Sequence, residues 1–138
     1  MLACSSICAQ TISTPEIGDP ERDRILDAAR APVESALGAP VLFRVDTLRS
    51  DDRWAFLTAV PVRSDGSRID YSGTPYAHDI EAGFFEDWVC ALLRREKGRW
   101  AVVELEIGAT DVPFADWPEE YGAPEALFNA DSATTQNE

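Results

Sequence analysis

Apolar residues recur every three or four positions over residues 19–37, and this period predicts an amphipathic helix. Asp19 followed by Pro20 is typical of a helix start, because the aspartate side chain accepts hydrogen bonds from free backbone N–H groups and proline fits the first helical turn. Gly38 follows the last apolar position and predicts the helix end. Pro32 removes a backbone donor inside this span, so we expect a kink or a split just before it.

Four later stretches alternate apolar and polar side chains with a period of two, which is typical of β-strands. They cover residues 41–48, 54–62, 88–93 and 100–107. Residues 50–52 (Ser-Asp-Asp) and 96–98 (Glu-Lys-Gly) are turn formers that separate the first two and the last two stretches. Connections this short join antiparallel neighbours, so the pattern predicts two hairpins in an antiparallel sheet.

The same alternation assigns side chains to faces of the predicted sheet. The apolar face of the first strand is expected to hold Val41, Phe43, Val45 and Thr47. The apolar face of the last strand is expected to hold Ala101, Val103, Leu105 and Ile107. We therefore expect the last three of these to point into the core, opposite Val89, Ala91 or Leu93 on the neighbouring strand.

The two hairpins are joined by a 23-residue connection, residues 63–85, in which periodicity is poor. Loops of this length in a compact domain are usually functional or contain short structure of their own. Thr74 followed by Pro75, with Gly83 further on, predicts one or two helical turns within it.

The chain after residue 108 is interrupted by prolines, and residues 117–121 with Gly122 fit a short helix. Large apolar side chains in this part are expected to cover an open side of the core; they are Phe114, Trp117, Tyr121, Leu127 and Phe128.

These elements together predict an α+β fold, in which an N-terminal helix packs on a four-stranded antiparallel sheet and a short helical segment follows. A chain of 138 residues has room for one domain, which we place at residues 19–128. Residues 1–18 are expected to be a disordered or residual signal segment. Residues 129–138 are polar and are expected to be a disordered tail.

The element order is similar to the cystatin-like or nuclear-transport-factor-like arrangement, in which a curved sheet wraps a helix. The chain also resembles small exported bacterial proteins of unassigned function. The residues that carry this resemblance are 54–56 (Trp-Ala-Phe), 69–70 (Ile-Asp), 74–76 (Thr-Pro-Tyr) and 108–112 (Gly-Ala-Thr-Asp-Val). The resemblance implies a fold but carries no catalytic residue.

Charge excludes one class of partner. The chain has 25 acidic and 12 basic residues, a net charge of −13, and no base follows Arg99. Nucleic-acid binding is not expected, because affinity for the phosphate backbone comes from basic side chains. The acidity serves either solubility alone or an acidic face for a cation or for a protein partner with a basic surface.

The first ten residues are small and apolar, and residues 7–10 (Ile-Cys-Ala-Gln) resemble a signal-peptide cleavage site. We expect a start upstream of Met1 and a periplasmic or secreted location, with a cytoplasmic one as the alternative. Cys4 and Cys8 would leave with a signal, and Cys90 is expected to pack as a small apolar group. No run approaches the length of about 18 apolar residues that a transmembrane helix needs.

No catalytic, metal or cofactor motif is present in the sequence. His78 beside Asp79 could serve as a general base, but a single histidine in a polar loop is more often solvated. Asp111 and Asp116, with Glu119 and Glu120, could bind calcium through oxygen ligands, but they lack the spacing of a calcium loop. We therefore predict no catalytic residue, no metal and no cofactor, and the pattern does not fix an oligomeric state.

The sequence favours a non-enzymatic exported binding module. Its ligand or partner surface is expected on the long connection and the acidic C-terminal segment, at Tyr71, Tyr76, His78, Asp79, Asp111, Asp116 and Trp117. One alternative is a pocket protein or small enzyme, because a curved sheet around a helix makes a cone that can hold a ligand. Another is an acidic inhibitor or immunity protein directed at a basic toxin.

Overall fold

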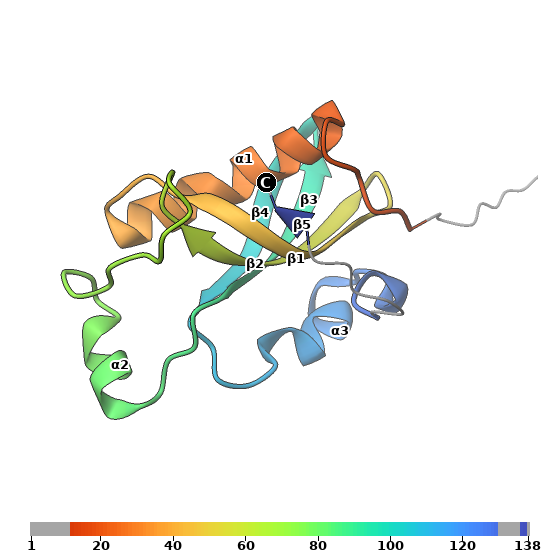
Figure 1. The fold of residues 1–138 in the computed structure, drawn as a ribbon. Helices are drawn as coiled ribbons and strands as arrows, with labels where there is room; N and C mark the ends of the chain where they lie inside the picture. Colours follow the sequence, from red (N-terminus) through yellow and green to blue (C-terminus); the bar gives the residue numbers. More distant parts are fainter. Residues whose placement is uncertain (1–11, 130–135, 138) are drawn as a thin grey trace, which may run out of the picture.

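The computed structural model describes residues 12–129 and 136–137. It confirms the predicted α+β class, with an N-terminal helix, a sheet of four main antiparallel strands and a short C-terminal helical segment (Figure 1). The elements in chain order are α1 (Pro20–Leu37), β1 (Leu42–Ser50), β2 (Trp54–Val62), α2 (Ala77–Ala82), β3 (Val89–Glu96), β4 (Arg99–Ile107), the 3-10 turn η1 (Pro113–Asp116), α3 (Trp117–Tyr121), the 3-10 turn η2 (Glu125–Leu127) and β5 (Gln136–Asn137).

Helix α1 begins and ends where its sequence predicts. The Asp19 side chain accepts a hydrogen bond of 2.9 Å from the Glu21 backbone N–H, and Gly38 ends the helix with a φ of 73°. This left-handed conformation carries little penalty for glycine because it has no Cβ. The expected split at Pro32 is not present, since one helix of 18 residues runs through it.

The sheet is a meander with the strand order β4-β3-β2-β1-β5, and all neighbours are antiparallel. Helix α1 crosses one face of the sheet, and the segment with η1, α3 and η2 lies against the other (Figure 1). The central strands β2 and β3 are therefore covered on both sides. This explains why five consecutive residues of β3, from Val89 to Leu93, are buried rather than alternating.

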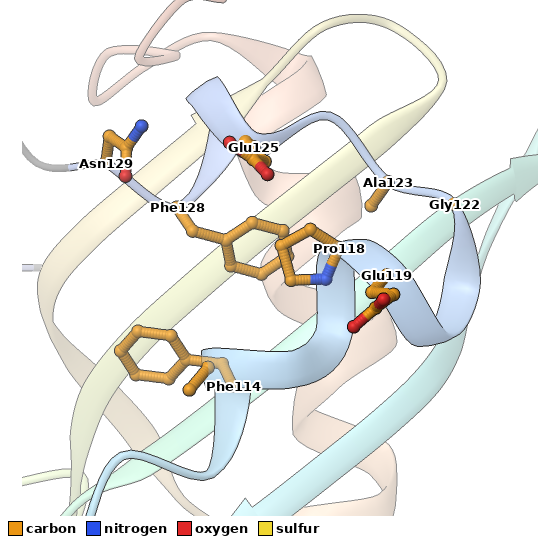
Figure 2. Close-up of a pocket in the computed structure, with 9 residues that line it drawn as sticks. Phe114, Pro118, Glu119, Gly122, Ala123, Glu125, Phe128 and Asn129 are labelled. Atoms are coloured by element: carbon orange, nitrogen blue, oxygen red, sulfur yellow. The ribbon is translucent and has the colours of Figure 1, made fainter.

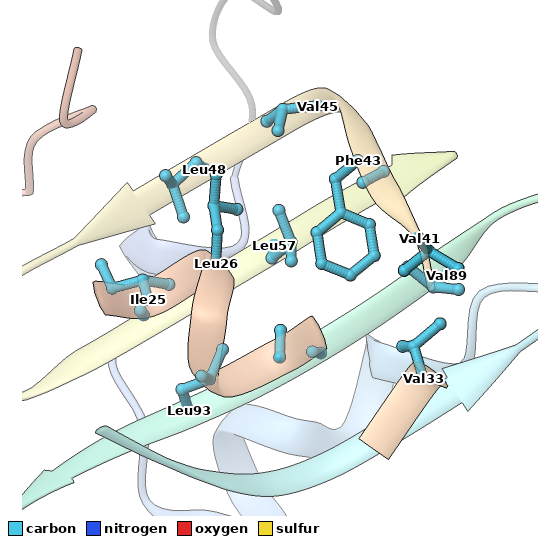
Figure 3. Close-up of a cluster of buried hydrophobic side chains, with 14 of the residues drawn as sticks. Ile25, Leu26, Val33, Val41, Phe43, Val45, Leu48, Leu57, Val89 and Leu93 are labelled. Carbon is cyan, nitrogen blue, oxygen red and sulfur yellow. The ribbon is translucent and has the colours of Figure 1, made fainter. Parts of the chain in front are cut away.

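The helix-side cluster is the larger of the two cores. Its α1 residues Ile25, Leu26 and Val33 face the strand residues Phe43 and Leu57, all buried (Figure 3). Other members include Val41, Val45, Leu48, Ala55, Ala59, Val89, Ala91, Leu93 and Trp100. The first turn of α1 is also tied to the hairpin of β3 and β4, because Arg95 Nη2 donates to Glu21 Oε2 at 2.8 Å and the Trp100 indole N–H donates to the same oxygen.

The opposite face holds the C-terminal cluster. It consists of Trp54, Phe56, Cys90, Leu92, Trp117, Ala123 and Leu127. Phe114, Tyr121 and Phe128 pack against it while remaining partly exposed. The prediction that large side chains after residue 108 cover an open side of the core is confirmed.

Two expected strand faces are partly wrong because each hairpin contains a β-bulge. In the pair of β3 and β4 the register shifts between Leu92 and Leu93, so Val102 turns to the helix-side cluster and Val103 to the C-terminal cluster. Leu105 pairs with Ala91 as expected. A bulge inserts one extra residue, which reverses the alternation on one side of it.

The second bulge lies in β1. The register shifts between Val45 and Thr47, and Leu48 rather than Thr47 is buried in the helix-side cluster.

The start of β4 also differs from the expected face. Ala101, expected on the apolar face of β4, is exposed, and Trp100 is buried in its place.

The long connection contains the predicted helix in a shorter form. Helix α2 begins at Ala77 rather than at Thr74, and Gly83 ends it with a φ of 82°. Thr74 still organises the start, since its hydroxyl accepts a hydrogen bond of 3.2 Å from the Tyr76 N–H and donates one of 2.7 Å to the Tyr71 carbonyl.

Parts of both predicted terminal segments contact the sheet. Ser13 and Ser50 exchange two backbone hydrogen bonds of 2.8 Å each, and β5 pairs with β1 at Arg44 and Val45. The signal-like residues with Cys4 and Cys8, and residues 130–135 of the tail, lie outside the described residues. Among the described helices, none has the length and apolar character of a membrane span.

Candidate functional site

An open groove lies between the helical turns of the C-terminal segment (Figure 2). Its volume is about 680 Å³, within the range of ligand-binding clefts. The residues that line it, called here the acidic groove, are Phe114, Ala115, Pro118, Glu119, Gly122, Ala123, Glu125, Phe128 and Asn129.

The local sequence explains why this segment turns back on itself. Pro113 starts η1 and Pro118 lies in the first turn of α3, where the missing N–H of proline costs little. Gly122 then ends α3 with a φ of 77°. The Arg49 side chain donates a hydrogen bond of 3.0 Å to the Leu127 carbonyl and fixes η2 to the sheet. The groove is therefore the space between two short turns that are held separately on the sheet.

Aromatic rings form the apolar part of the acidic groove. The rings of Phe114 and Phe128 stack with centroids 6.2 Å apart and an interplanar angle of 15°. Both pack on Phe56 of β2, at 4.8 and 4.7 Å between centroids. Since Phe56 is buried, these contacts place the two half-exposed rings on a rigid base.

Carboxylates form the polar part of the acidic groove. Glu119 follows Pro118 in α3 and Glu125 begins η2, and both residues are exposed. None of the described residues that line the groove is basic, and the sequence has no base after Arg99. The site therefore offers apolar ring surface beside negative charge, which suits a cation with an apolar stem.

The residues predicted as a single surface are divided between different parts of the fold. Tyr71 and Tyr76 pack against Phe85 next to the helix-side cluster, with ring centroids 4.8 and 5.7 Å from the Phe85 ring. Trp117 belongs to the C-terminal cluster on the other face, where it is 4% exposed.

Tyr71 is held by a carboxylate that lies just before β3. Its hydroxyl donates a hydrogen bond of 2.6 Å to Asp87 Oδ1, and Arg68 Nε lies 3.5 Å from Asp87 Oδ2. Burial raises the pKa of the Tyr71 hydroxyl, and the bond to Asp87 raises it further. The tyrosine therefore stays protonated and closes the long connection onto the start of β3.

The remaining predicted residues are exposed. His78 and Asp79 lie on α2, Asp111 precedes η1, and Asp116 is the last residue of η1. Neither His78 nor Asp111 lines the acidic groove. The described residues contain no group of three or more His, Cys, Asp and Glu side chains arranged to hold a metal ion.

Cys90 is a packing residue in the C-terminal cluster. It is fully buried, and burial raises the pKa of its thiol to about 12. A protonated, inaccessible thiol is a poor nucleophile.

Sequence reasoning identified the aromatic residues of this region and considered Glu119 only as a calcium ligand, but it did not group Glu119 and Glu125 with the aromatic rings. Glu119 and Glu125 belong to no motif, and their only signal is that they lie among prolines and aromatic residues in the acidic end of the chain. Comparison of the chain with protein-family models, curated proteins and solved structures found no match.

Proposed function

We propose that this protein is a non-enzymatic binding module that holds a basic side chain of a protein partner in the acidic groove. The observation that carries the proposal is the combination, in one cavity, of the stacked Phe114 and Phe128 rings with Glu119 and Glu125. The chemistry favours lysine or arginine, whose aliphatic stems pack on apolar surface while the charged end meets carboxylates.

The size of each contribution supports a modest, specific interaction. A cation over an aromatic face gains about 0.5–2 kcal/mol, and an exposed ion pair adds at most about 1 kcal/mol. One basic side chain therefore gives weak binding on its own. A partner with several basic residues around the anchored one gains further, because the net charge of −13 attracts a basic surface and speeds its encounter.

The packing of the core favours binding in the acidic groove. It does not favour a ligand site in a cone between the sheet and the helix. The face of the sheet under α1 is filled by the helix-side cluster, in which Leu26, Phe43 and Leu57 are at most 1% exposed. The acidic groove lies on the other face and opens to solvent, as a surface for a protein partner must.

The test uses a capped peptide of alternating alanine and arginine, with a glutamate-for-arginine peptide as the control ligand. Binding is followed by NMR, through the backbone amide shifts of residues 114–129. The variant Glu119→Gln with Glu125→Gln removes the groove charge. The matched variant Glu81→Gln with Glu96→Gln removes the same charge from exposed residues elsewhere.

We expect the groove variant to weaken binding of the arginine peptide about tenfold, which corresponds to about 1.4 kcal/mol. The matched variant should stay within about twofold of the unmodified protein. Equal weakening by both variants would show that overall charge, and not the groove, attracts the peptide. Absence of any saturable shift would also overturn the proposal.

A further inference from the structure

A second cavity of opposite character adjoins the acidic groove. It has a volume of about 310 Å³ and is called here the arginine pocket. Its lining residues are Arg53, Trp54, Arg94, Tyr121, Gly122 and Pro124. Gly122 lines both cavities, so the turn at the end of α3 separates them.

The pairing of β2 with β3 places Arg94 at this cavity. Trp54 and Arg94 are directly opposed in the pairing of β2 and β3, so their side chains project from the same face. The Arg94 guanidinium lies over the Trp54 ring, 5.3 Å from its centroid. This stacking orients the guanidinium and leaves the N–H groups on its edge for a ligand.

Arg53 is placed by the turn between β1 and β2. Asp51 Oδ1 accepts hydrogen bonds from the backbone N–H groups of Arg53 and Trp54, at 2.9 and 2.7 Å. The Arg53 carbonyl accepts a further bond of 2.8 Å from the Arg95 N–H. The backbone that carries the Arg53 side chain is therefore fixed on both sides.

Neither guanidinium of the arginine pocket is paired with a carboxylate of the described residues. No acidic residue lines the pocket, and neither the Arg53 nor the Arg94 guanidinium forms a hydrogen bond or ion pair with any described residue. The Tyr121 hydroxyl that lies at this pocket donates its hydrogen bond to Glu104 of β4. In a chain with 25 acids and 12 bases, this cavity is lined by two arginines and by no acidic residue.

We propose that the arginine pocket binds an oxyanion group, a carboxylate or a phosphate, between Arg53 and Arg94. Two guanidinium groups present planar pairs of N–H donors that match the oxygens of either anion. Trp54, Pro124 and the Tyr121 ring supply apolar surface for the carbon skeleton that carries the anion. This site is separate from the proposed function, since it needs no basic partner.

Inorganic phosphate and acetate are the two probes, titrated at constant ionic strength and pH 7. The observables are the NMR signals of the Trp54 indole N–H and the Arg94 side-chain N–H. Saturable shifts with phosphate alone identify a phosphate site, and saturable shifts with acetate at equal or lower concentration identify a carboxylate site. Either result supports the proposal, and saturation with neither probe overturns it.

Variants distinguish anion binding in the arginine pocket from a general attraction of anions to exposed arginines. Arg53→Gln and Arg94→Gln should each weaken anion binding about tenfold or more, because hydrogen bonds between charged groups are among the strongest in proteins. Arg99→Gln removes an exposed arginine of β4 outside the pocket and should change affinity by less than about twofold. If Arg99→Gln weakened anion binding as much as Arg94→Gln, the proposal would be overturned. Unchanged thermal melting of each variant confirms that the fold is kept.

The two proposals fail independently. The groove variant Glu119→Gln with Glu125→Gln should bind the arginine peptide more weakly and the anion unchanged. Arg94→Gln should bind the anion more weakly and the arginine peptide unchanged. Loss of anion binding in the groove variant would contradict the arginine pocket as a separate site. An unmodified protein that binds the anion but not the arginine peptide would establish the oxyanion site and overturn only the proposed function.

Discussion

Gly108 lies directly against the ring of Phe85. A Cβ atom built on Gly108 would overlap the Cε2 and Cδ2 atoms of that ring, far inside van der Waals contact. The same glycine follows β4 with a φ of 82°, a conformation that side chains disfavour. The Gly108 N–H donates a hydrogen bond of 2.9 Å to the Trp88 carbonyl. The backbone therefore cannot move away from the Phe85 ring without loss of this hydrogen bond.

Gly108→Ala should therefore destabilise the protein by more than the conformational penalty alone. The left-handed conformation contributes about 1–2 kcal/mol. The contact with Phe85 adds a steric term of the order of 1–3 kcal/mol, as overpacked sites show. The measurement is the free energy of unfolding in urea. Gly98→Ala is the control, because Gly98 has a φ of 77° but no described atom within 4 Å of its Cβ position. Equal losses in both variants would contradict a steric role for Phe85.

Trp117→Ala should mainly lower the stability of the fold. Trp117 is 4% exposed within the C-terminal cluster, and removing a buried aromatic side chain costs about 3–5 kcal/mol. Urea denaturation measures this loss. Phe84→Ala removes an aromatic side chain that is 69% exposed and should change stability by less than about 0.5 kcal/mol. A stable Trp117→Ala protein would mean that this residue does not anchor α3.

Stability should fall as the pH rises through the alkaline range. The Cys90 pKa is raised by burial from 9.0 to about 12, and burial also raises the pKa of Tyr71 above its ordinary value of 10.0. In the unfolded chain both groups lose their protons at lower pH than in the native protein. The native state then binds more protons, so this contribution is intact below pH 9.0 and decreases from there towards the raised pKa values.

The test of the alkaline prediction is the urea midpoint of Cys90→Ala against that of the unmodified protein over the same pH range. The variant is expected to be less stable at neutral pH but to lose less of its stability in the first part of the alkaline decline. Tyr71→Phe should reduce the later part in the same way. Parallel curves for all three proteins would rule out these two groups as the cause.

A chain that begins at Pro15 should be less stable than one that begins at Ile12. The shorter chain lacks both backbone hydrogen bonds between Ser13 and Ser50, which contribute about 0.5–1.5 kcal/mol each. It also lacks Ile12, which packs against the C-terminal cluster. Thermal melting of the two chains gives the difference. Ser13→Ala keeps the backbone bonds and removes only the 3.4 Å bond from the Ser13 hydroxyl to the Ser50 carbonyl, so it should lose less stability than the shorter chain.

Local signals were sufficient for the helix and the hairpins. The bounds of α1 follow from Asp19 and Gly38, whose effects depend on neighbours within a few residues. Strand faces were predictable only up to each bulge. The extra residue near Val103 is set by how β4 pairs with β3, and the alternation of β4 itself contains no sign of it.

The candidate sites were less predictable because they combine distant parts of the chain. Arg53 and Arg94 are 41 positions apart and line the same pocket, because the turn before β2 carries Arg53 and the pairing of β2 with β3 places Arg94 beside Trp54. The acidic groove depends on Phe56, which holds Phe114 and Phe128 together from β2. The predicted residues Tyr71 and Trp117 are conspicuous in the sequence because they are aromatic, and the fold uses both for packing.

The meander order of the sheet has a kinetic consequence. Neighbouring strands among β1 to β4 are also consecutive in the chain, so β1 and β2 meet through a short turn, and β3 and β4 do the same. Only the step from β2 to β3 requires closure of a long loop, and its entropy grows slowly with length. Low sequence separation between contacting residues is associated with fast folding. The two hairpins should therefore form early and independently, and their docking through β2 and β3 should limit the folding rate.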